Sequence, residues 1–307
     1  MTLGTPTSDE ALALGTEGND DRFTAIDTMS VTDLAAAMNA EDARVPSAVA
    51  AALPSIVIAI DAVIERLRRG GRLIYVGAGT PGRIAVLDAS ECPPTFGTDP
   101  NDVFAIIAGG EAALINAREG AEDDVAAAVA AIHASAVGES DVVVGIASSG
   151  RTPFVLSAIE EARRRGAATI GVSCNRNTPL SVASEHPIEV IVGPEIISGS
   201  TRLKAGTAQK LVLNMISTIS MVALGRTYGN LMVDVRASNA KLRERAVRIV
   251  STVADVEPKR ARSALESGNF QVKPTIVSLR LGLPLDEAAA LLDRHQGRLR
   301  DVLGAQS

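Results

Sequence analysis

Short apolar runs alternate with longer helical patterns through the central part of the chain. Each run has four to six residues, is rich in β-branched side chains and is bounded by Gly, Ser or Asp. Fully apolar short runs are typical of parallel strands buried on both faces, with the helices forming right-handed crossovers between them. The pattern predicts an α/β fold, a doubly wound five-stranded parallel sheet with flanking helices. The predicted strands are Leu73–Val76, Val103–Ala108, Val142–Ala147, Thr169–Ser173 and Ile188–Val192.

Helical patterns precede the strands. Residues 1–24 are rich in Gly, Thr, Asp and Glu and are interpreted as a loose arm. A helix is then predicted to begin at a cap supplied by Ser30 or Thr32. A longer helix over residues 47–69 ends in a basic turn followed by Gly70-Gly71, which is a typical stop signal.

The last third of the chain is predicted to be helical. A helix of about 20 residues follows Gly206, and another covers residues 237–253. The first of these has apolar residues on one face, namely Leu211, Met215, Ile219 and Val222. Three shorter helical patterns follow, Pro258–Ser267, Lys273–Leu281 and Leu285–His295, separated by glycines. They predict a small helical bundle.

Composition excludes several classes of protein. With 307 residues and 46% apolar content, the chain can form one large domain plus a small one, with a sizeable core. A net charge of −6 and only 2% aromatic residues argue against a nucleic-acid partner. The apolar stretches are interrupted by Asp61 and Asn214, so we expect no membrane span. The first basic residue is Arg22, so no targeting segment is expected, and the predicted location is the cytoplasm.

Cysteine and histidine offer little metal chemistry. Cys92 and Cys174 form no CxxC pair, and they are interpreted as small core or loop residues rather than nucleophiles. His133, His186 and His295 are scattered along the chain. We therefore expect no metal site.

The loop after the first predicted strand is rich in glycine. In a doubly wound sheet, ligands bind outside the carboxyl ends of the strands, so these loops are the natural place for a site. The segment Gly77–Arg83 reads GAGTPGR, whose glycines let the backbone approach an anion, and Pro81 suits a first helical turn. A dinucleotide site would need an acid at the end of the next strand, and Glu111 lies just beyond that position. The glycine spacing alone therefore leaves the ligand open.

The loop after the third predicted strand favours phosphate. Ser148, Ser149 and Thr152 surround a glycine at a strand-to-helix turn. Helix capping needs only one hydroxyl, whereas three can donate to a phosphate together with backbone N–H groups. No Lys-Ser/Thr pair follows the glycine, so the pattern indicates a small phosphate ester rather than a nucleotide-binding P-loop. After the fifth strand, Gly193–Thr207 is interpreted either as a capped helix start or as a second anion-binding segment.

Two acidic positions are candidates for proton transfer. Glu91 precedes Cys92-Pro93-Pro94, and because Pro93 disfavours helix at the preceding residue, Glu91 is predicted to lie at a helix end. A carboxylate there opposes the helix dipole, so the alternatives are a functional acid and a solvated one. The second candidate cluster is Glu119–Asp124, which also fits the acidic first turn of a helix. Its spacing does not distinguish Glu122 from its neighbours.

Three segments resemble the N-acetylmuramic acid 6-phosphate etherases. They are Gly77–Pro94 (GAGTPGRIAVLDASECPP), Ala147–Pro153 (ASSGRTP) and Gly193–Lys210 (GPEIISGSTRLKAGTAQK), the last similar to a signature of glucokinase regulatory proteins. The resemblance runs from about Thr16 to the C-terminus. One departure is Pro81, where many relatives carry Ser; it removes a hydroxyl and an N–H from the first loop.

The resemblance implies a sugar isomerase (SIS) domain with a flavodoxin-like sheet over residues 47–250. An N-terminal arm and helix would occupy residues 1–46, and a ubiquitin-associated-like (UBA-like) helical domain residues 251–307. It further implies a cytoplasmic homodimer without cofactor that recycles peptidoglycan sugar. Such enzymes convert N-acetylmuramate 6-phosphate and water into N-acetylglucosamine 6-phosphate and D-lactate.

By resemblance, the catalytic acid matches Glu91 and the second active-site carboxylate matches Glu122. An acid that must hold its proton is expected to be desolvated, here beside the Cys92-Pro93-Pro94 turn. Glu122 would be the base or the water activator. The expected substrate-binding residues are Gly79, Thr80, Ser148, Ser149, Thr152, Ser200 and Lys204. A non-catalytic phosphosugar sensor and a phosphosugar isomerase remain alternatives, and an assay for released D-lactate separates them from the etherase.

Overall fold

The computed structural model describes residues 15–116 and 118–304. The chain forms two compact units. The first, here called the sheet unit, comprises the residues up to Ala89 together with Asn101–Ile216. The second, the helical unit, comprises Ser90–Pro100 and the residues from Ser217 onward.

The sheet unit is built on five parallel strands, as the hydrophobic pattern predicts. Their order is β2-β1-β3-β4-β5, the flavodoxin-like arrangement. At their carboxyl ends, Gly77 of β1 pairs with Ile107 of β2 on one side and Ile146 of β3 on the other. The strands are β1 (Leu73–Gly77), β2 (Val103–Ile107), β3 (Val142–Ile146), β4 (Ala168–Ser173) and β5 (His186–Glu189).

The fifth strand starts earlier than predicted. The apolar run predicts 188–192, whereas β5 covers His186–Glu189 and includes Pro187. Proline is tolerated there because β5 is an edge strand, and only one side of it bonds to the sheet. Periodicity could not place this boundary, since an edge strand need not be apolar throughout.

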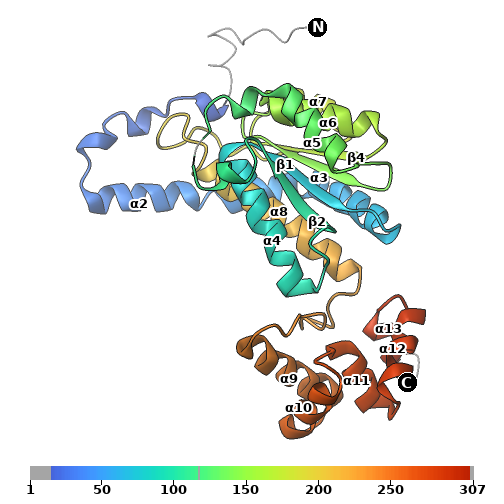
Figure 1. The fold of residues 1–307 in the computed structure, drawn as a ribbon. Helices are drawn as coiled ribbons and strands as arrows, with labels where there is room; N and C mark the ends of the chain where they lie inside the picture. The colour runs from blue at the N-terminus through green and yellow to red at the C-terminus, as the bar shows by residue number, and fades with distance from the viewer. Residues whose placement is uncertain (1–14, 117, 305–307) are drawn as a thin grey trace. The chain divides into compact units, whose positions relative to one another are not determined.

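Helices cover both faces of the sheet (Figure 1). One face carries α5 (Val125–Ala134), α6 (Pro153–Arg164) and α7 (Pro179–Ala183), and the other carries α3 (Val45–Arg68), α4 (Gly79–Phe96) and α8 (Lys204–Ala223). The core between the sheet and α6 consists of fully buried aliphatic side chains such as Val143, Val155 and Ile159. This packing confirms the doubly wound fold.

Helices α2 (Val31–Asp42) and α3 follow each other closely. Ser30 caps α2 as predicted, since its Oγ accepts the Asp33 N–H at 3.1 Å. Contrary to the expectation of no membrane-length stretch, Val31–Arg68 is apolar and long enough to cross a membrane by composition. The internal packing of α3 offers another reason for its apolar character: Ile56, Ile60 and Val63 are buried against the sheet unit.

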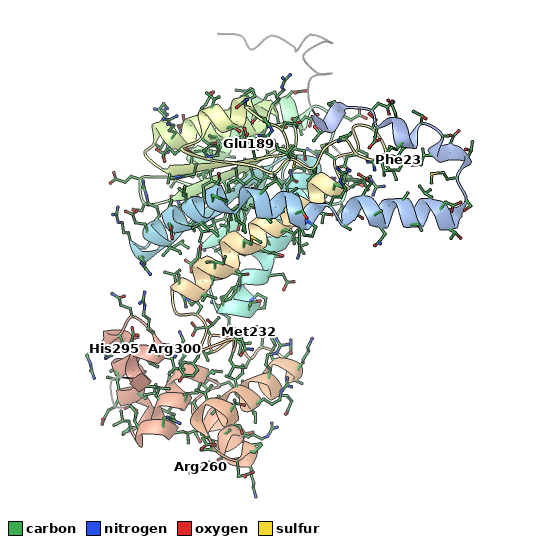
Figure 2. All side chains as sticks on the ribbon, turned by 180° about the vertical axis from the view of Figure 1, so that it is seen from behind. Phe23, Glu189, Met232, Arg260, His295 and Arg300 are labelled. Atoms are coloured by element: carbon green, nitrogen blue, oxygen red, sulfur yellow. The ribbon has the colours of Figure 1, made fainter. Side chains whose placement is uncertain are left out.

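The described part of the N-terminal arm is docked rather than loose. Short 3₁₀ turns occupy Gly15–Glu17, Asp21–Phe23 and Ile26–Thr28, and Phe23 lies beside α2 (Figure 2). Thr16 is fully buried: its N–H donates to Asn175 Oδ1 at 3.2 Å, and its Oγ1 accepts from Asn175 Nδ2 at 2.9 Å. These paired polar groups fix a segment whose composition indicates only a polar arm. Residues 1–14 of the arm lie outside the described residues.

Helix α8 buries a different face from the predicted one. Ile219 and Val222 are 45% and 49% exposed. The buried side chains include Val212, Leu213 and Ile216. The helix is apolar on more than one side, so periodicity alone cannot identify the side that meets the core.

The helical unit has its own apolar core. Val247 and Val250 of α9 share it with Ile276 of α11, so α9 belongs with the C-terminal helices and the unit begins earlier than residue 251. Met232, Arg260 and His295 mark this unit in Figure 2. Its helices are α9 (Ala240–Ala254), α10 (Pro258–Ser267), α11 (Val272–Leu281), α12 (Leu285–Arg294) and α13 (Leu299–Gly304).

Candidate functional site

The strand order creates a switch point between β1 and β3. From β1 the chain crosses to β2 on one side, whereas the strands after β3 follow on the other side. Ligands of open α/β sheets bind at the carboxyl ends of the strands at such a point. Because Gly77 pairs with Ile146, the loops that begin at Ala78 and Ala147 leave the sheet side by side. These two loops are the glycine-rich and hydroxyl-rich segments of the sequence.

The loop after β1 is held close to the sheet by glycines. A Cβ on Gly82 would lie 2.6 Å from Ile107 Cγ1 and 2.8 Å from the Gly77 carbonyl oxygen. Gly79 opens α4 with a φ of +57°, and Pro81 sits in the first turn, as predicted. The free N–H groups of this first turn can bind an anion.

The loop after β3 places its first hydroxyl in a buried position. Ser148 is 5% exposed, and its Oγ accepts a hydrogen bond from Gln209 Nε2 at 2.9 Å. Its carbonyl oxygen accepts from the N–H of Cys174 and from Asn175 Nδ2, both at 2.9 Å. The turn is therefore anchored to α8 and to the segment after β4.

The remaining hydroxyls of this loop are less buried. Ser149 Oγ accepts the Arg151 N–H at 3.2 Å, and the Thr152 side chain makes no capping bond to α6 although it occupies the N-cap position. Gly150 has a φ of +67°, and a Cβ there would lie 2.4 Å from Thr178 Oγ1. Only glycine fits at position 150, and its tight turn keeps the hydroxyls of Ser148, Ser149 and Thr152 close together.

The first turn of α8 lies beside both loops. A Cβ on Gly206 would be 3.6 Å from Thr80 Cγ2, and Gln209 reaches Ser148 from the next turn. Of the predicted substrate-binding residues, Thr80 and Ser148 thus both lie beside the first two turns of α8. Ser200 is half-buried in the loop that precedes this helix.

Lys204 has an ion-pair partner inside the protein. Its Nζ lies 2.7 Å from Glu41 Oε2, and both side chains are almost fully buried. The Glu195 carboxylate caps α8 by accepting the N–H groups of Lys204 at 3.0 Å and Ala205 at 2.9 Å. Burial raises the pKa of Glu195, and these backbone bonds work against that rise. Within one chain, then, the Lys204 ammonium is committed to Glu41.

Glu91 does not lie at a helix end. Helix α4 continues through Pro93 and Pro94 to Phe96, so Glu91 precedes the end by five residues. Each proline removes a backbone N–H from the helix and crowds the carbonyl four residues earlier, so the two prolines weaken the last turns of α4 without ending the helix before Phe96. Glu91 is exposed, so the predicted desolvation beside the Pro93-Pro94 turn is not provided by its own chain.

Glu122 lies in a short 3₁₀ turn, Ala121–Asp123, before α5. It is exposed, as is Asp123. Asp124 is assigned a structural role, since its Oδ1 accepts the Ala127 N–H at 2.9 Å and caps α5. This turn lies near the carboxyl end of β2, because a Cβ on Gly109 would be 3.3 Å from the Cβ of Ala121. Since Asp124 caps α5, Glu122 and Asp123 remain as the candidate acids of this turn.

Both cysteines are buried, as predicted. Burial raises the pKa of Cys174 to about 12, so its thiol is not activated as a nucleophile. Within residues 15–116 and 118–304, no group of three or more His, Cys, Asp or Glu side chains is arranged to hold a metal ion.

The sequence patterns missed two buried polar groups. Gln209 is fully buried beside Ser148. Asp88 accepts hydrogen bonds from Tyr75 Oη at 2.8 Å and Asn214 Nδ2 at 2.5 Å, which join β1, α4 and α8. The available signal was the occurrence of two amide side chains, Gln209 and Asn214, among the apolar residues of this helix.

Comparison with known proteins agrees with this geometry. Residues 55–163 match the glucokinase regulatory protein N-terminal SIS domain, and residues 124–219 match the SIS domain. A phosphoheptose isomerase from Francisella tularensis has the same fold, with a TM-score of 0.51 and 22% identity over 63% of this chain and 100% of that one. The N-acetylmuramic acid 6-phosphate etherase of Rubrobacter xylanophilus is 54% identical over 96% of this chain and 98% of its own. That of Streptomyces avermitilis is 51% identical over 96% of this chain and 95% of its own.

Fold, switch-point loops and domain matches together define a SIS-domain protein. At about half identity over nearly the whole chain, the similarity is more specific than the fold. The chain belongs to the N-acetylmuramic acid 6-phosphate etherase family, and it is accordingly a carbon–oxygen lyase.

Proposed function

We propose that the protein cleaves the D-lactyl ether of N-acetylmuramic acid 6-phosphate, releasing D-lactate and N-acetylglucosamine 6-phosphate during peptidoglycan recycling. The observation that carries this proposal is the pair of loops at the β1/β3 switch point, in a chain about half identical to named etherases. The α4 N-terminus and the hydroxyls of Thr80, Ser148, Ser149 and Thr152 match the donors that a phosphate group requires. Gly79 and Ser200 would contribute backbone and loop contacts, and Lys204, whose ammonium pairs with Glu41, would hold the start of α8 in place beside both loops.

The proposed reaction proceeds by elimination followed by addition of water. Direct displacement would expel a poor alkoxide leaving group, whereas opening the sugar to its aldehyde makes the C2 proton acidic. A base removes that proton while the C3–O bond breaks, and an acid protonates the departing lactate oxygen. Water then adds across the C2–C3 double bond, with its oxygen on C3 and a proton on C2. The two carboxylates assigned to these proton transfers are Glu91 and Glu122.

The position of Glu91 along α4 bears on where it acts. It follows Gly79 by 12 residues in one continuous helix, a rise of about 18 Å at 1.5 Å per residue. A monosaccharide anchored by its phosphate at Gly79 is shorter than this. We therefore assign to each site the loops of one chain and Glu91 of the partner subunit, in a homodimer.

Exposed apolar side chains on α3 support a second copy of the chain as partner. Leu53, Val57 and Ile58 on α3 are 41%, 53% and 59% exposed; Leu53 and Val57 are one turn apart, and Ile58 follows Val57 directly. Exposed large apolar side chains that are close together on a helix are typical of protein interfaces. The buried thiols of Cys92 and Cys174 fit a reducing compartment, and we place the enzyme in the cytoplasm.

The direct test replaces the proposed acid. Glu91→Gln should lower D-lactate release by roughly 10²–10⁴-fold, because a general acid or base contributes about that much. Circular dichroism and the KM for substrate should change little, since the side chain is exposed and keeps its size. Glu122→Gln and Asp123→Asn, measured in parallel, decide which acid of the 3₁₀ turn takes part.

Retained turnover in Glu91→Gln would remove this residue from the mechanism. Absence of D-lactate from the wild-type reaction would instead favour the sensor or isomerase alternatives. Interconversion of aldose and ketose phosphates would identify the isomerase.

A further inference from the structure

A buried amide lies directly behind the proposed phosphate loop. Gln209 is fully buried on α8, and its Nε2 donates to Ser148 Oγ at 2.9 Å. The bond joins α8 to the turn after β3, across 61 residues of sequence. Of all described contacts, this is the one that acts on the hydroxyl oxygen of Ser148 itself.

Packing does not explain a glutamine at this position. Its Oε1 is buried without a hydrogen-bond partner, one of three such side-chain atoms in the described part of the chain. A buried acceptor without a partner lowers stability relative to an apolar side chain of similar size. The neighbouring buried residues of α8, Val212, Leu213 and Ile216, are apolar. The amide therefore has a role other than stabilising the helix.

We infer that Gln209 is a positioning residue that fixes the direction of the Ser148 hydroxyl bond, so that Ser148 donates its proton to the phosphate of the substrate. A serine hydroxyl has one proton and can accept as well as donate. When Oγ accepts from Gln209, its own proton remains free for another acceptor. Phosphate oxygens only accept, so the Gln209 amide, the Ser148 hydroxyl and the phosphate form one chain of donors. The inference rests on the proposed function, which puts the phosphate at this turn.

The polarity of the side chain at position 209 provides the test. Gln209→Glu keeps the size and reach but replaces the donor by a carboxylate that only accepts. It would draw the Ser148 proton toward itself and add a negative charge behind the phosphate. Gln209→Leu removes the donor without reversing it.

The readouts are kcat and KM for N-acetylmuramic acid 6-phosphate and the inhibition constant of inorganic phosphate, all with the full-length enzyme. For Gln209→Glu, KM and the inhibition constant should rise about tenfold or more, because charge-assisted hydrogen bonds to the anion are lost. Since the phosphate is held equally in ground state and transition state, kcat should stay within about twofold. Gln209→Leu should give a smaller rise in both constants, with an unchanged or higher unfolding temperature.

Ser220→Ala is the matched control. Ser220 is also a fully buried residue of α8 whose Oγ has no partner in the described structure. It lies 11 residues beyond Gln209, about 16 Å along the helix. Its replacement should leave KM and phosphate inhibition unchanged.

The outcomes separate this inference from the proposed site. If Ser148→Ala raises KM and the phosphate inhibition constant but Gln209→Glu raises neither, Gln209 has no positioning role. If Ser148→Ala changes neither constant, the proposed phosphate site itself is wrong. Should Gln209→Glu fail to fold, Gln209→Leu decides, because an unchanged phosphate inhibition constant in that variant contradicts the inference.

Discussion

At the scale of single residues, the buried pair of Lys204 and Glu41 links the start of α8 to the end of α2. Burial disfavours the charged Glu41 carboxylate, but hydrogen bonds from Lys204 and Arg22 outweigh it and hold the pKa of Glu41 below its ordinary value of 4.5. A lowered carboxyl pKa stabilises the fold above the ordinary value, and that stabilisation is lost as pH falls through the lowered one. Glu41 therefore favours folding at neutral pH.

Removing one partner of this pair should be costly. We expect Lys204→Met to lower the free energy of unfolding by roughly 1.5–3 kcal/mol at pH 7, because the buried Glu41 carboxylate loses its Lys204 partner but keeps Arg22, whose Nη2 lies 2.8 Å from Glu41 Oε1. The double variant Glu41→Gln/Lys204→Met should recover most of that loss. In denaturant titrations, the difference in stability between wild type and Glu41→Gln should shrink as the pH is lowered below 4.5.

Arg69→Met is the control for this prediction. Arg69 pairs with Glu65 on α3, but both side chains are more than 60% exposed, so the pair should contribute almost nothing. Equal losses of unfolding free energy in Lys204→Met and Arg69→Met would show that the buried pair matters no more than an exposed one. A stability difference between wild type and Glu41→Gln that grows as the pH falls would contradict the lowered pKa of Glu41.

The positions of candidate site residues could be predicted from sequence only where a side chain follows the end of a strand. Ser148 and Thr80 were predicted by their place after β3 and β1, and both lie beside α8. Gln209 was not, because its partner is 61 residues away in the sequence. The use of Lys204 in an ion pair with Glu41 was missed for the same reason, since only the folded chain brings the two together.

At the scale of elements, the apolar pattern predicted strands better than helix ends and helix faces. A strand buried on both faces is apolar throughout, so β1 to β4 were found within a residue or two of their bounds. The end of α4 was misplaced because Pro93 usually marks a helix boundary, whereas here the helix continues to Phe96. The face of α8 was misassigned because apolar side chains occur on more than one side of this helix, so periodicity does not identify the side that meets the core.

Helix α3 shows how one helix can meet two requirements. Its buried side packs on the sheet unit through Ile56, Ile60 and Val63, while Leu53 and Val57 remain exposed. The apolar side chains on both sides of α3 contribute to the hydropathy by which the stretch Val31–Arg68 is apolar enough to cross a membrane. A dimer interface on the exposed side would give these residues a place away from water without a lipid surface.

At the scale of the whole molecule, a shared site makes a prediction about mixed dimers. Glu91→Gln should remove the catalytic acid that one subunit gives to its partner's site. Ser148→Asp should disable the phosphate loop of its own chain, because a carboxylate at position 148 repels the phosphate. When the two variants are unfolded and refolded together, half of the dimers should be mixed, and each should contain one intact site. Activity should then return to about a quarter of the wild-type value.

Each variant refolded alone is the control and should remain inactive. If Glu91 acts within its own chain, the mixture should be as inactive as the separate variants. A mixture without activity would therefore place both parts of the site on one chain.

The central claim is that the ether bond breaks by elimination and that water then adds to the unsaturated sugar. The most direct measurement runs the wild-type reaction in deuterated water and examines the N-acetylglucosamine 6-phosphate product by NMR and mass spectrometry. The account predicts deuterium on carbon 2 of the product, because the proton removed there is replaced from solvent. A product that keeps its original hydrogen at carbon 2 would contradict the account and point to direct displacement at the ether.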